Sequence, residues 1–290
     1  MPNAPADSRY LEEPFVESIL CVTDFSPASL HAFAHALMMA VNLRCQLTLF
    51  HVENPGQFDV EWARVPLVRA LLEKWGYLEK GSPRSAVFEK VAVRVSKVEV
   101  VAENALRALL DYLQEEPVDL VVLATEEQHG AASWLRASAP DRLIHDSRVM
   151  TLFVPPAGRG FVSLEQGGFV LKRVLVPIDA HPDPHPAVTY AFRAAAFSSE
   201  DLVRMYLLHV GNGPPPPHID IPERPYLSWE TLTRTGPVAG EILHAAAALD
   251  TDLLVMTTRG SQGFLDALRG RVSRRIIQSA QCPVLAIPVT

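Results

Sequence analysis

Short apolar segments alternate with amphipathic segments along most of the chain. Residues 18–23, 46–52 and 119–124 are apolar almost throughout, as strands buried on both faces of a sheet are. Residues 28–41 instead carry apolar positions at helical spacing, and Ser26 and Pro27 before them form a helix-start signal. Strands that alternate with helices predict an α/β fold, in which a parallel sheet is covered by helices on both faces.

The same alternation continues to the end of the chain. Predicted strands cover residues 18–23, 46–52, 91–101, 119–124 and 149–154, then 173–178, 203–210, 228–235, 252–257 and 284–289. Predicted helices cover residues 28–41, 60–79, 104–115 and 140–146, then 187–197, 238–249 and 271–279. The pattern therefore predicts two tandem, doubly wound, parallel five-stranded sheets of Rossmann-like type.

The order of elements repeats because the sequence itself repeats. Asp119 and Asp252 lie 133 positions apart, and several neighbouring residues keep the same offset. A repeat of this length indicates one fold unit built twice. His51 and His209 lie 158 positions apart, so about 25 residues of the first copy have no counterpart in the second. These extra residues lie between the second and third predicted strands of the first copy.

The repeat and the local composition together divide the chain. We expect a flexible tail over residues 1–13 and a first unit over residues 14–156. Residues 155–168 are rich in glycine and proline, and the predicted linker covers residues 157–170. The second unit then covers residues 171–290.

Composition and charge narrow the class of protein. The chain is 48% hydrophobic and 20% charged, as globular proteins are, and its net charge of −7 argues against nonspecific binding of nucleic acid. No apolar run approaches the ~20 residues that cross a bilayer, and the first 13 residues lack the plan of a signal peptide. We therefore expect a cytoplasmic protein. Cys21, Cys45 and Cys282 are predicted to be buried, inert thiols, because their number is odd and their spacing irregular.

Several short motifs occur at matching places in the two copies. The first strand ends in Thr-Asp-Phe-Ser in one copy and in Pro-Ile-Asp in the other, and the second strand ends in His-Val in both. Gly236 and Pro237 precede a predicted helix, Cys-Pro-Val begins at Cys282, and a glycine-bearing loop follows the fourth strand. With these features the chain resembles tandem members of the universal stress protein family from residue 15 to residue 288.

The resemblance carries several implications for the architecture. It implies an adenine nucleotide alpha hydrolase-like fold with a pseudo-two-fold relation between the copies. It also implies that the last strands of the two copies, residues 149–154 and 284–289, pair with each other inside one chain. A homodimer remains open, although no residue in the sequence supports it.

ATP-binding members of the family carry the motif G-x2-G-x9-G-[ST] after the fourth strand. Glycine lets the backbone approach ribose and phosphates, and the hydroxyl residue begins a helix whose free N–H groups face phosphate. In the second copy the motif falls on Thr257, Gly260, Gly270 and Arg271, so two of its glycines match. Arg271 either clamps a phosphate or fills the site with its bulk. The resemblance favours binding of ATP, with or without Mg²⁺, over a merely structural turn.

The first copy has lost the motif. The same positions there are Ala124, Glu127, Ala137 and Ser138, so every glycine is replaced. Glu126 and Glu127 would each oppose a phosphate by roughly 1–3 kcal/mol. We expect the first copy not to bind nucleotide, while a different, uncharged ligand remains open.

The resemblance also implies which residues of the second copy contact the nucleotide. They lie at the ends of its first, second and fourth strands, in the glycine loop, and at the start of the last helix. The predicted contacts are Pro177, Ile178, Asp179, Val210, Met256, Thr257, Gly260, Gly270, Arg271, Val272 and Ser273. Asp179 has a second interpretation as a helix N-cap, but the prolines at 182, 184 and 186 shift that helix start later and favour a free carboxylate.

Two further groups of polar residues are candidate sites. His181, Asp183 and His185 alternate along a proline-rich segment, and three such ligands meet a zinc ion only if that segment is extended. We predict a solvated loop there and no metal site. His51 and His209 are predicted to hydrogen-bond to backbone rather than to act as general bases.

Three classes of function fit the sequence. The first is a stress-response or regulatory protein that binds ATP in its C-terminal unit and acts on an unidentified regulatory protein partner. The second is a degenerate interaction module without nucleotide, for which Thr257 and Arg271 are the evidence. The third and weakest is a slow ATPase, and no catalytic residue is predicted. An adenylate-forming enzyme would carry a HIGH-type or SGGxDS-type signature, and neither occurs in the sequence. Neither nucleic acid nor a membrane is an expected partner.

Overall fold

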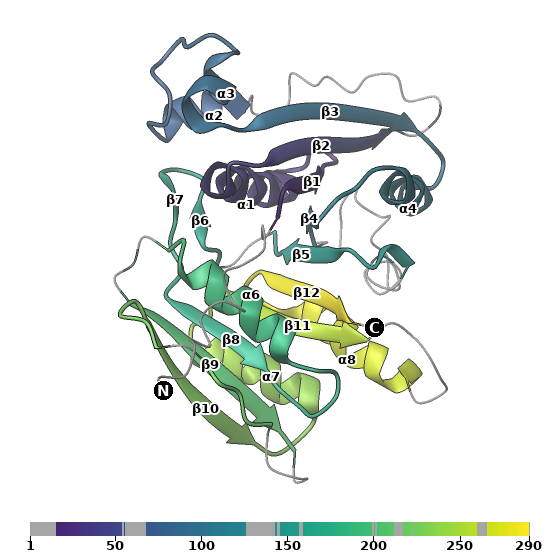
Figure 1. Cartoon of the computed structure of the whole chain (residues 1–290). Helices are drawn as coiled ribbons and strands as arrows, with labels where there is room; N and C mark the ends of the chain where they lie inside the picture. The colour runs from purple at the N-terminus through teal and green to yellow at the C-terminus, as the bar shows by residue number, and fades with distance from the viewer. Residues whose placement is uncertain are drawn as a thin grey trace, which may run out of the picture.

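The computed structural model of the chain describes residues 16–53, 55, 68–125, 143, 146–156, 159–198, 200, 202–211, 217–221, 223–259 and 266–289. Of residues 259 and 266–271 it describes the backbone. These residues form a ten-stranded sheet in the order β10-β9-β8-β11-β12-β5-β4-β1-β2-β3, together with a separate two-stranded hairpin, β6-β7 (Figure 1).

The elements follow one another in the predicted alternation. The first half contains β1 (Ser18–Val22), α1 (Pro27–Leu43), β2 (Gln46–Glu53), α2 (Val68–Lys74), α3 (Ala86–Val91), β3 (Arg94–Val101), α4 (Ala105–Glu115), β4 (Leu120–Ala124) and β5 (Met150–Val154). The hairpin strands β6 (Val162–Ser163) and β7 (Gly167–Phe169) come next. The second half contains β8 (Arg173–Pro177), α6 (His185–Ala195), β9 (Val203–Val210), β10 (Leu227–Arg234), α7 (Val238–Ala248), β11 (Leu253–Arg259), α8 (Asp266–Ser279) and β12 (Val284–Val289).

Each half of the sheet has the strand order of a doubly wound fold. Within a half all neighbouring strands are parallel. The halves meet where β5 and β12 pair antiparallel, with Leu152 opposite Leu285. The α/β fold and the pairing of the last strands inside one chain are thereby confirmed.

Helices cover both faces of the sheet and divide the buried side chains into two cores. The core under α1 and α6 contains Phe33, Phe192 and the hairpin residue Phe161. The core under α4, α7 and α8 contains Leu109, Ile276 and other side chains. Strands buried on both faces account for the continuous apolar runs in the sequence.

Local hydrogen bonds at helix starts agree with the sequence. Ser26 caps α1 by accepting from the backbone N–H of Ser29, and Pro27 occupies the first turn. Asn104 caps α4 by accepting from the N–H of Arg107 at 3.0 Å. Both predicted starts are confirmed because a cap requires only residues adjacent in the sequence.

The repeated aspartates hold equivalent places in the two halves. Asp119 Oδ2 accepts from the N–H groups of Glu17 and Ser18 at 2.8 and 2.9 Å. Asp252 Oδ2 accepts from the N–H groups at positions 172 and 173, at 2.9 and 2.8 Å. Each carboxylate thus fixes the start of the first strand of its half against the start of the fourth strand.

The segment between β2 and β3 differs from its prediction. The sequence predicts helix over residues 60–79, broken by Pro66, but α2 ends at Lys74 and a second, unpredicted helix, α3, follows at Ala86. Residues 60–67 lie outside the described residues. The strand expected from residue 91 begins at Arg94, because α3 ends at Val91 and Ala92 turns the chain in a left-handed conformation.

The predicted linker packs against the first half as the β6-β7 hairpin (Figure 1). Trp75 donates its indole N–H to the carbonyl of Leu164 at 3.2 Å, and the hairpin residue Gly167 approaches the Trp75 ring so closely that a Cβ would lie 2.5 Å from it. Lys74 forms an ion pair with Glu165 at 2.7 Å. The boundaries proposed for the two units remain a prediction.

Within the described ranges, no helix combines the length and the apolar composition that crossing a bilayer needs.

Candidate functional site

The sheet opens at one place in its second half, between β8 and β11. These neighbours share only two registered pairs in the described sheet, Leu253 with Val174 and Leu254 with Leu175. On either side the ladders run further, because β8 stays paired with β9 to Pro177 and β11 stays paired with β12 to Arg259. In the sheet order β10-β9-β8-β11-β12, the strands are added on one side of β8 up to β10 and on its other side from β11 onward. Ligands of doubly wound sheets bind at such a switch point.

The end of β8 brings three of the predicted residues to this opening. Pro177 is half-buried, and Ile178 is buried and donates its N–H to the carbonyl of Leu208 at 2.8 Å. Asp179 is exposed, and its Oδ1 accepts from the adjacent N–H of Ala180 at 2.7 Å. Pro184, not Asp179, is the N-cap residue of α6. The carboxylate therefore remains at the strand end, as predicted.

A histidine fixes the second strand against the first in each half. His51 Nδ1 donates to the carbonyl of Thr23 at 2.8 Å, and His209 Nδ1 donates to the carbonyl of Ile178 at 3.3 Å. Both side chains are buried. The prediction that these histidines hydrogen-bond to backbone is confirmed.

The strands β9 and β11 complete the predicted floor. Val210, at the end of β9, is half-buried and packs against the core under α7 and α8, which also contains Met256. Thr257 is half-buried and lies on the opposite side of β11 from Met256, because successive side chains of a strand alternate. The end of β11 thus offers an apolar contact on one face and a hydroxyl on the other.

The helix predicted to begin at Arg271 begins earlier. The helix α8 starts at Asp266, so Gly270 and Arg271 lie in its second turn. Only the N–H groups in the first turn of a helix lack partners within the helix. The N–H groups of Arg271 and of the residues after it therefore donate within α8 and do not face a ligand. Val272 is half-buried against the core, and Ser273 is half-buried. Gly260 lies outside the described residues.

The first half has a related opening with different chemistry. The strands β1 and β4 share three registered pairs, from Ile19 with Leu120 to Cys21 with Val122. Asp24, at the end of β1, accepts from the N–H of Ser26 through Oδ1, while its Oδ2 is buried without a hydrogen-bond partner among the described residues. Asp24 belongs to the Thr-Asp-Phe-Ser motif at the end of the first strand, and the sequence predicts no role for it. Only burial revealed its unpaired oxygen.

The loop after β4, where the first half has lost the glycine motif, lies mostly outside the described residues. Ala124 ends β4 and is half-buried. Residues 126, 127, 137 and 138 lie outside the described residues, so the loss of nucleotide binding in the first half remains a prediction.

The histidine and aspartate cluster before α6 is exposed. Asp183 Oδ1 lies 2.6 Å from Nδ1 of His185, and this hydrogen bond lowers the pKa of the Asp183 carboxyl. His181 is exposed as well. Across the residues that the structure describes, no three His, Cys, Asp or Glu side chains are grouped as metal ligands would be.

The three cysteines are free and buried. Burial raises the pKa of the thiols of Cys21, Cys45 and Cys282 to about 12. They stay protonated near neutral pH and are unsuited to nucleophilic chemistry, which confirms the prediction of inert thiols.

Comparison with known proteins adds to this geometry. The sequence model of the universal stress protein family matches residues 16–155 and 220–288. The crystal structure of a universal stress protein from Archaeoglobus fulgidus DSM 4304 is 14% identical, with 93% of this chain and 96% of that chain covered and a TM-score of 0.59. A functionally unknown protein from Pseudomonas aeruginosa PAO1 is 13% identical, with 97% and 95% covered and a TM-score of 0.64. At these identities the structural likeness shows the fold alone. No curated protein matches the sequence.

Proposed function

Because the chain belongs to the universal stress protein family, we propose that it is a stress-response or regulatory protein that binds ATP in its C-terminal half. The ligand lies at the carboxyl edge of β8, β9 and β11. The observation that carries the proposal is the opening between β8 and β11, with the exposed Asp179 on one side and the half-buried Thr257 on the other.

The adenosine moiety is assigned to the strand ends. Asp179 presents a carboxylate that accepts hydrogen bonds from ribose hydroxyls, and Pro177 and Ile178 lie beside it. Val210 offers a half-buried apolar surface to the base. The floor consists of Met256 and Thr257.

The phosphates are assigned to Gly260, Gly270, Arg271, Val272 and Ser273, as the family motif implies. Since α8 runs through Gly270 in the free chain, this assignment requires the helix to shorten from its N-terminus when ATP binds. A glycine inside a helix disfavours that helix by about 1 kcal/mol relative to alanine, so Gly270 lowers the cost of shortening. The released N–H groups then face the triphosphate.

The decisive experiment is calorimetric titration of the full chain with ATP, with and without Mg²⁺, after mass spectrometry of the purified protein for bound adenine nucleotide. Gly270→Trp places a large side chain at the phosphates and is expected to abolish binding. The matched control is Ala137→Trp, at the repeat-equivalent position of the first half, which is expected to leave the dissociation constant unchanged. No binding by the unmodified chain, or equal binding by Gly270→Trp, refutes the proposal.

A second variant separates the two roles open to Arg271. Arg271→Ser restores the residue type of the family motif. If the arginine obstructs the site, ATP binds more tightly to the variant, and if it clamps a phosphate, ATP binds more weakly. An unchanged dissociation constant contradicts both accounts.

A nucleotide-free interaction module is the second candidate. The observation that favours it is the early start of α8, which leaves Arg271 inside a helix instead of at a helix start. Null titrations with both the unmodified chain and Gly270→Trp support this candidate. Slow release of phosphate from bound ATP, measured in the same preparation, tests the weaker ATPase alternative.

A further inference from the structure

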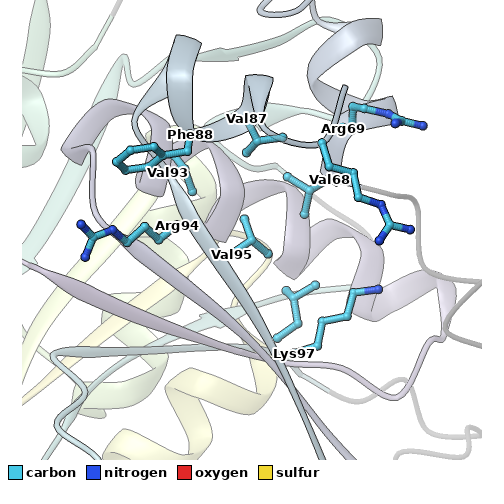
Figure 2. A pocket seen from close by; sticks show the side chains of 10 residues that line it. Val68, Arg69, Val87, Phe88, Val93, Arg94, Val95 and Lys97 are labelled. Atoms are coloured by element: carbon cyan, nitrogen blue, oxygen red, sulfur yellow. The ribbon is translucent and has the colours of Figure 1, made fainter. Parts of the chain in front are cut away.

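A cavity of about 570 Å³ lies between the segment containing α2 and α3 and the strands β2 and β3. Its apolar lining consists of Leu49, Val68, Val87, Phe88, Val93 and Val95. Figure 2 shows Val68, Val87 and Val95 around the space between the two short helices and β3. The volume is that of a site for a small molecule.

The polar lining of this cavity is entirely cationic among the residues that the structure describes. It consists of Arg69, Arg84, Arg94 and Lys97, and no described lining residue is a carboxylate. The chain as a whole has a net charge of −7, so this concentration of positive charge opposes the overall balance. Such a lining attracts anions.

The cations are distributed around an apolar centre. In the view of Figure 2, Arg69 and Lys97 lie on one side of the cavity and Phe88 and Arg94 on the other. Arg94 lies over the Phe88 ring at 5.4 Å, and Phe88 is 52% exposed. Arg69 forms an ion pair with Glu73, in which its Nε atom lies 3.5 Å from Glu73 Oε1, so this guanidinium is already partly neutralised. The other cations of the lining are Arg84, Arg94 and Lys97.

At the strand positions that the structure describes in both halves, the second half lacks this lining. Because His51 and His209 are equivalent, Leu49 on β2 corresponds to Leu207 on β9. Leu49 lies opposite Lys97 and Leu207 lies opposite Thr231, so Lys97 corresponds to Thr231. By the same alignment Val95 corresponds to Trp229, which is 41% exposed. One wall of the cavity is formed by the α2 and α3 segment, which the first copy has in excess, and the other wall by two strands that have counterparts in the second copy. Nucleotide binding in the second copy gives the excess residues no role.

The cavity is also separate from the proposed nucleotide site. Its lining comes from α2, from α3 and the residues beside it, from the middle of β2 and from the first half of β3, all in the N-terminal half of the chain. The nucleotide is assigned to the carboxyl ends of strands in the other half. Occupation of one site is therefore measurable without the other.

We propose that this cavity binds a small amphipathic anion, a molecule with an apolar body and a single carboxylate or phosphate group. The valines enclose the apolar body, and the guanidinium and ammonium groups hold the anionic head. A carboxylate and a phosphate share this chemistry, and the probes below distinguish them.

The test is calorimetric titration of the full chain with decanoate, decyl phosphate, neutral decanol and inorganic phosphate. We expect decanoate or decyl phosphate to bind, and the tighter of the two identifies the head group. Decanol lacks the charge and inorganic phosphate lacks the apolar body, so both are expected to bind at least about tenfold more weakly.

Variants taken from the repeat connect binding to the cavity. Lys97→Thr installs the residue of the second half and is expected to weaken binding of the anion about tenfold. Val95→Trp also installs the second-half residue, and its bulk fills the cavity and abolishes binding. Lys80→Thr is the matched control, because Lys80 is exposed and outside the lining, and it is expected to bind as the unmodified chain does.

Several outcomes overturn the proposal. They are the absence of binding by both amphipathic anions, equal binding of decanol, equal binding of inorganic phosphate, and an unchanged affinity in both Lys97→Thr and Val95→Trp. Circular dichroism and thermal melting without ligand verify that each variant is folded. If Lys97→Thr is unfolded, Arg84→Gln takes its place with the same expected loss of affinity.

Discussion

Lowering the pH from 7.5 to 4 is expected to destabilise this protein through one buried histidine, His35 on α1. Its side chain is 1% exposed and lies beneath the hairpin segment, with its ring edge-on to Phe161 at a centroid distance of 4.6 Å. Its Nδ1 donates to the carbonyl of His31 at 2.8 Å, while its Nε2 is buried without a hydrogen-bond partner in the described structure. A Cβ at Gly160 would lie 2.6 Å from that Nε2, so the hairpin segment closes tightly over the ring.

The environment makes the charged form of His35 costly. The pKa of His35 is lowered from 6.5 to about 4. Burial is the main cause, the hydrogen bond to the His31 carbonyl opposes the shift, and the charge of the nearby His31 adds to it. Protonation would also place an N–H at Nε2 with no acceptor in reach.

The direction of the pH effect follows from proton uptake. Below pH 6.5 the unfolded chain binds a proton at His35, whereas the folded chain binds it only below about pH 4. The stabilisation is therefore fully present above pH 6.5 and declines by at most about 1.4 kcal/mol for each pH unit below it. Between the two pKa values the total loss is roughly 3 kcal/mol.

The assay is urea denaturation at intervals from pH 7.5 to pH 4, with the free energy of unfolding extrapolated to water. His35→Gln keeps a donor for the His31 carbonyl, but its side chain does not titrate. Between pH 7.5 and pH 4 the variant is therefore expected to lose roughly 3 kcal/mol less of its free energy of unfolding than the unmodified chain loses. His244→Gln is the control, because His244 is exposed on α7, and it is expected to follow the unmodified chain. Equal pH dependence in His35→Gln and the unmodified chain refutes the reasoning.

Three further substitutions test individual contacts by their effect on the free energy of unfolding. Gly236→Ala is expected to lower the free energy of unfolding by about 1–3 kcal/mol in thermal or urea denaturation, because Gly236 has a φ of 144° and an added Cβ would lie 2.9 Å from a glutamate oxygen. The control is Gly240→Ala inside α7, which is expected to stabilise the protein by about 0.5–1 kcal/mol. A similar loss of stability in both variants would disprove the backbone argument. Asp252→Ala leaves two backbone N–H groups without their acceptor and is expected to lower the free energy of unfolding by about 2–3 kcal/mol. Asp119→Ala is expected to cost less, because Asp252 is buried and Asp119 is exposed. A larger loss of stability in Asp119→Ala would contradict this reasoning. Trp75→Phe removes the indole N–H that donates to the hairpin and is expected to lower the free energy of unfolding by about 1 kcal/mol. It is also expected to accelerate amide hydrogen exchange in β6 and β7. Unchanged exchange would show that this hydrogen bond does not hold the hairpin in place.

The candidate nucleotide site was only partly accessible to sequence reasoning. The spacing of the motif located the strand ends, and the structure brings Asp179, Val210 and Thr257 to one edge of the sheet. The start of α8 was predicted five residues too late, because Asp266 to Gly270 form helix in the chain whereas the family motif implies a loop. A motif specifies residue types, but the balance between loop and helix depends on the free energy of the surrounding contacts.

Sequence alone determined the features that depend on neighbouring residues or on periodicity. Apolar runs buried on both faces defined the strands, Ser26 and Asn104 defined two helix starts, and the offset of 133 between Asp119 and Asp252 revealed two equivalent halves. These signals are reliable because a cap needs a partner only three residues away, and a strand between two helical layers has no polar face.

Only the tertiary structure decided how distant segments meet. It placed the hairpin over His35, divided the segment before β3 into α2 and α3, and enclosed a cationic cavity beneath them. No local pattern specifies these results, because burial and the proximity of charges arise from residues far apart in the sequence. The pKa of His35 and the lining of the cavity are consequences of packing, and packing exists only once the chain is folded.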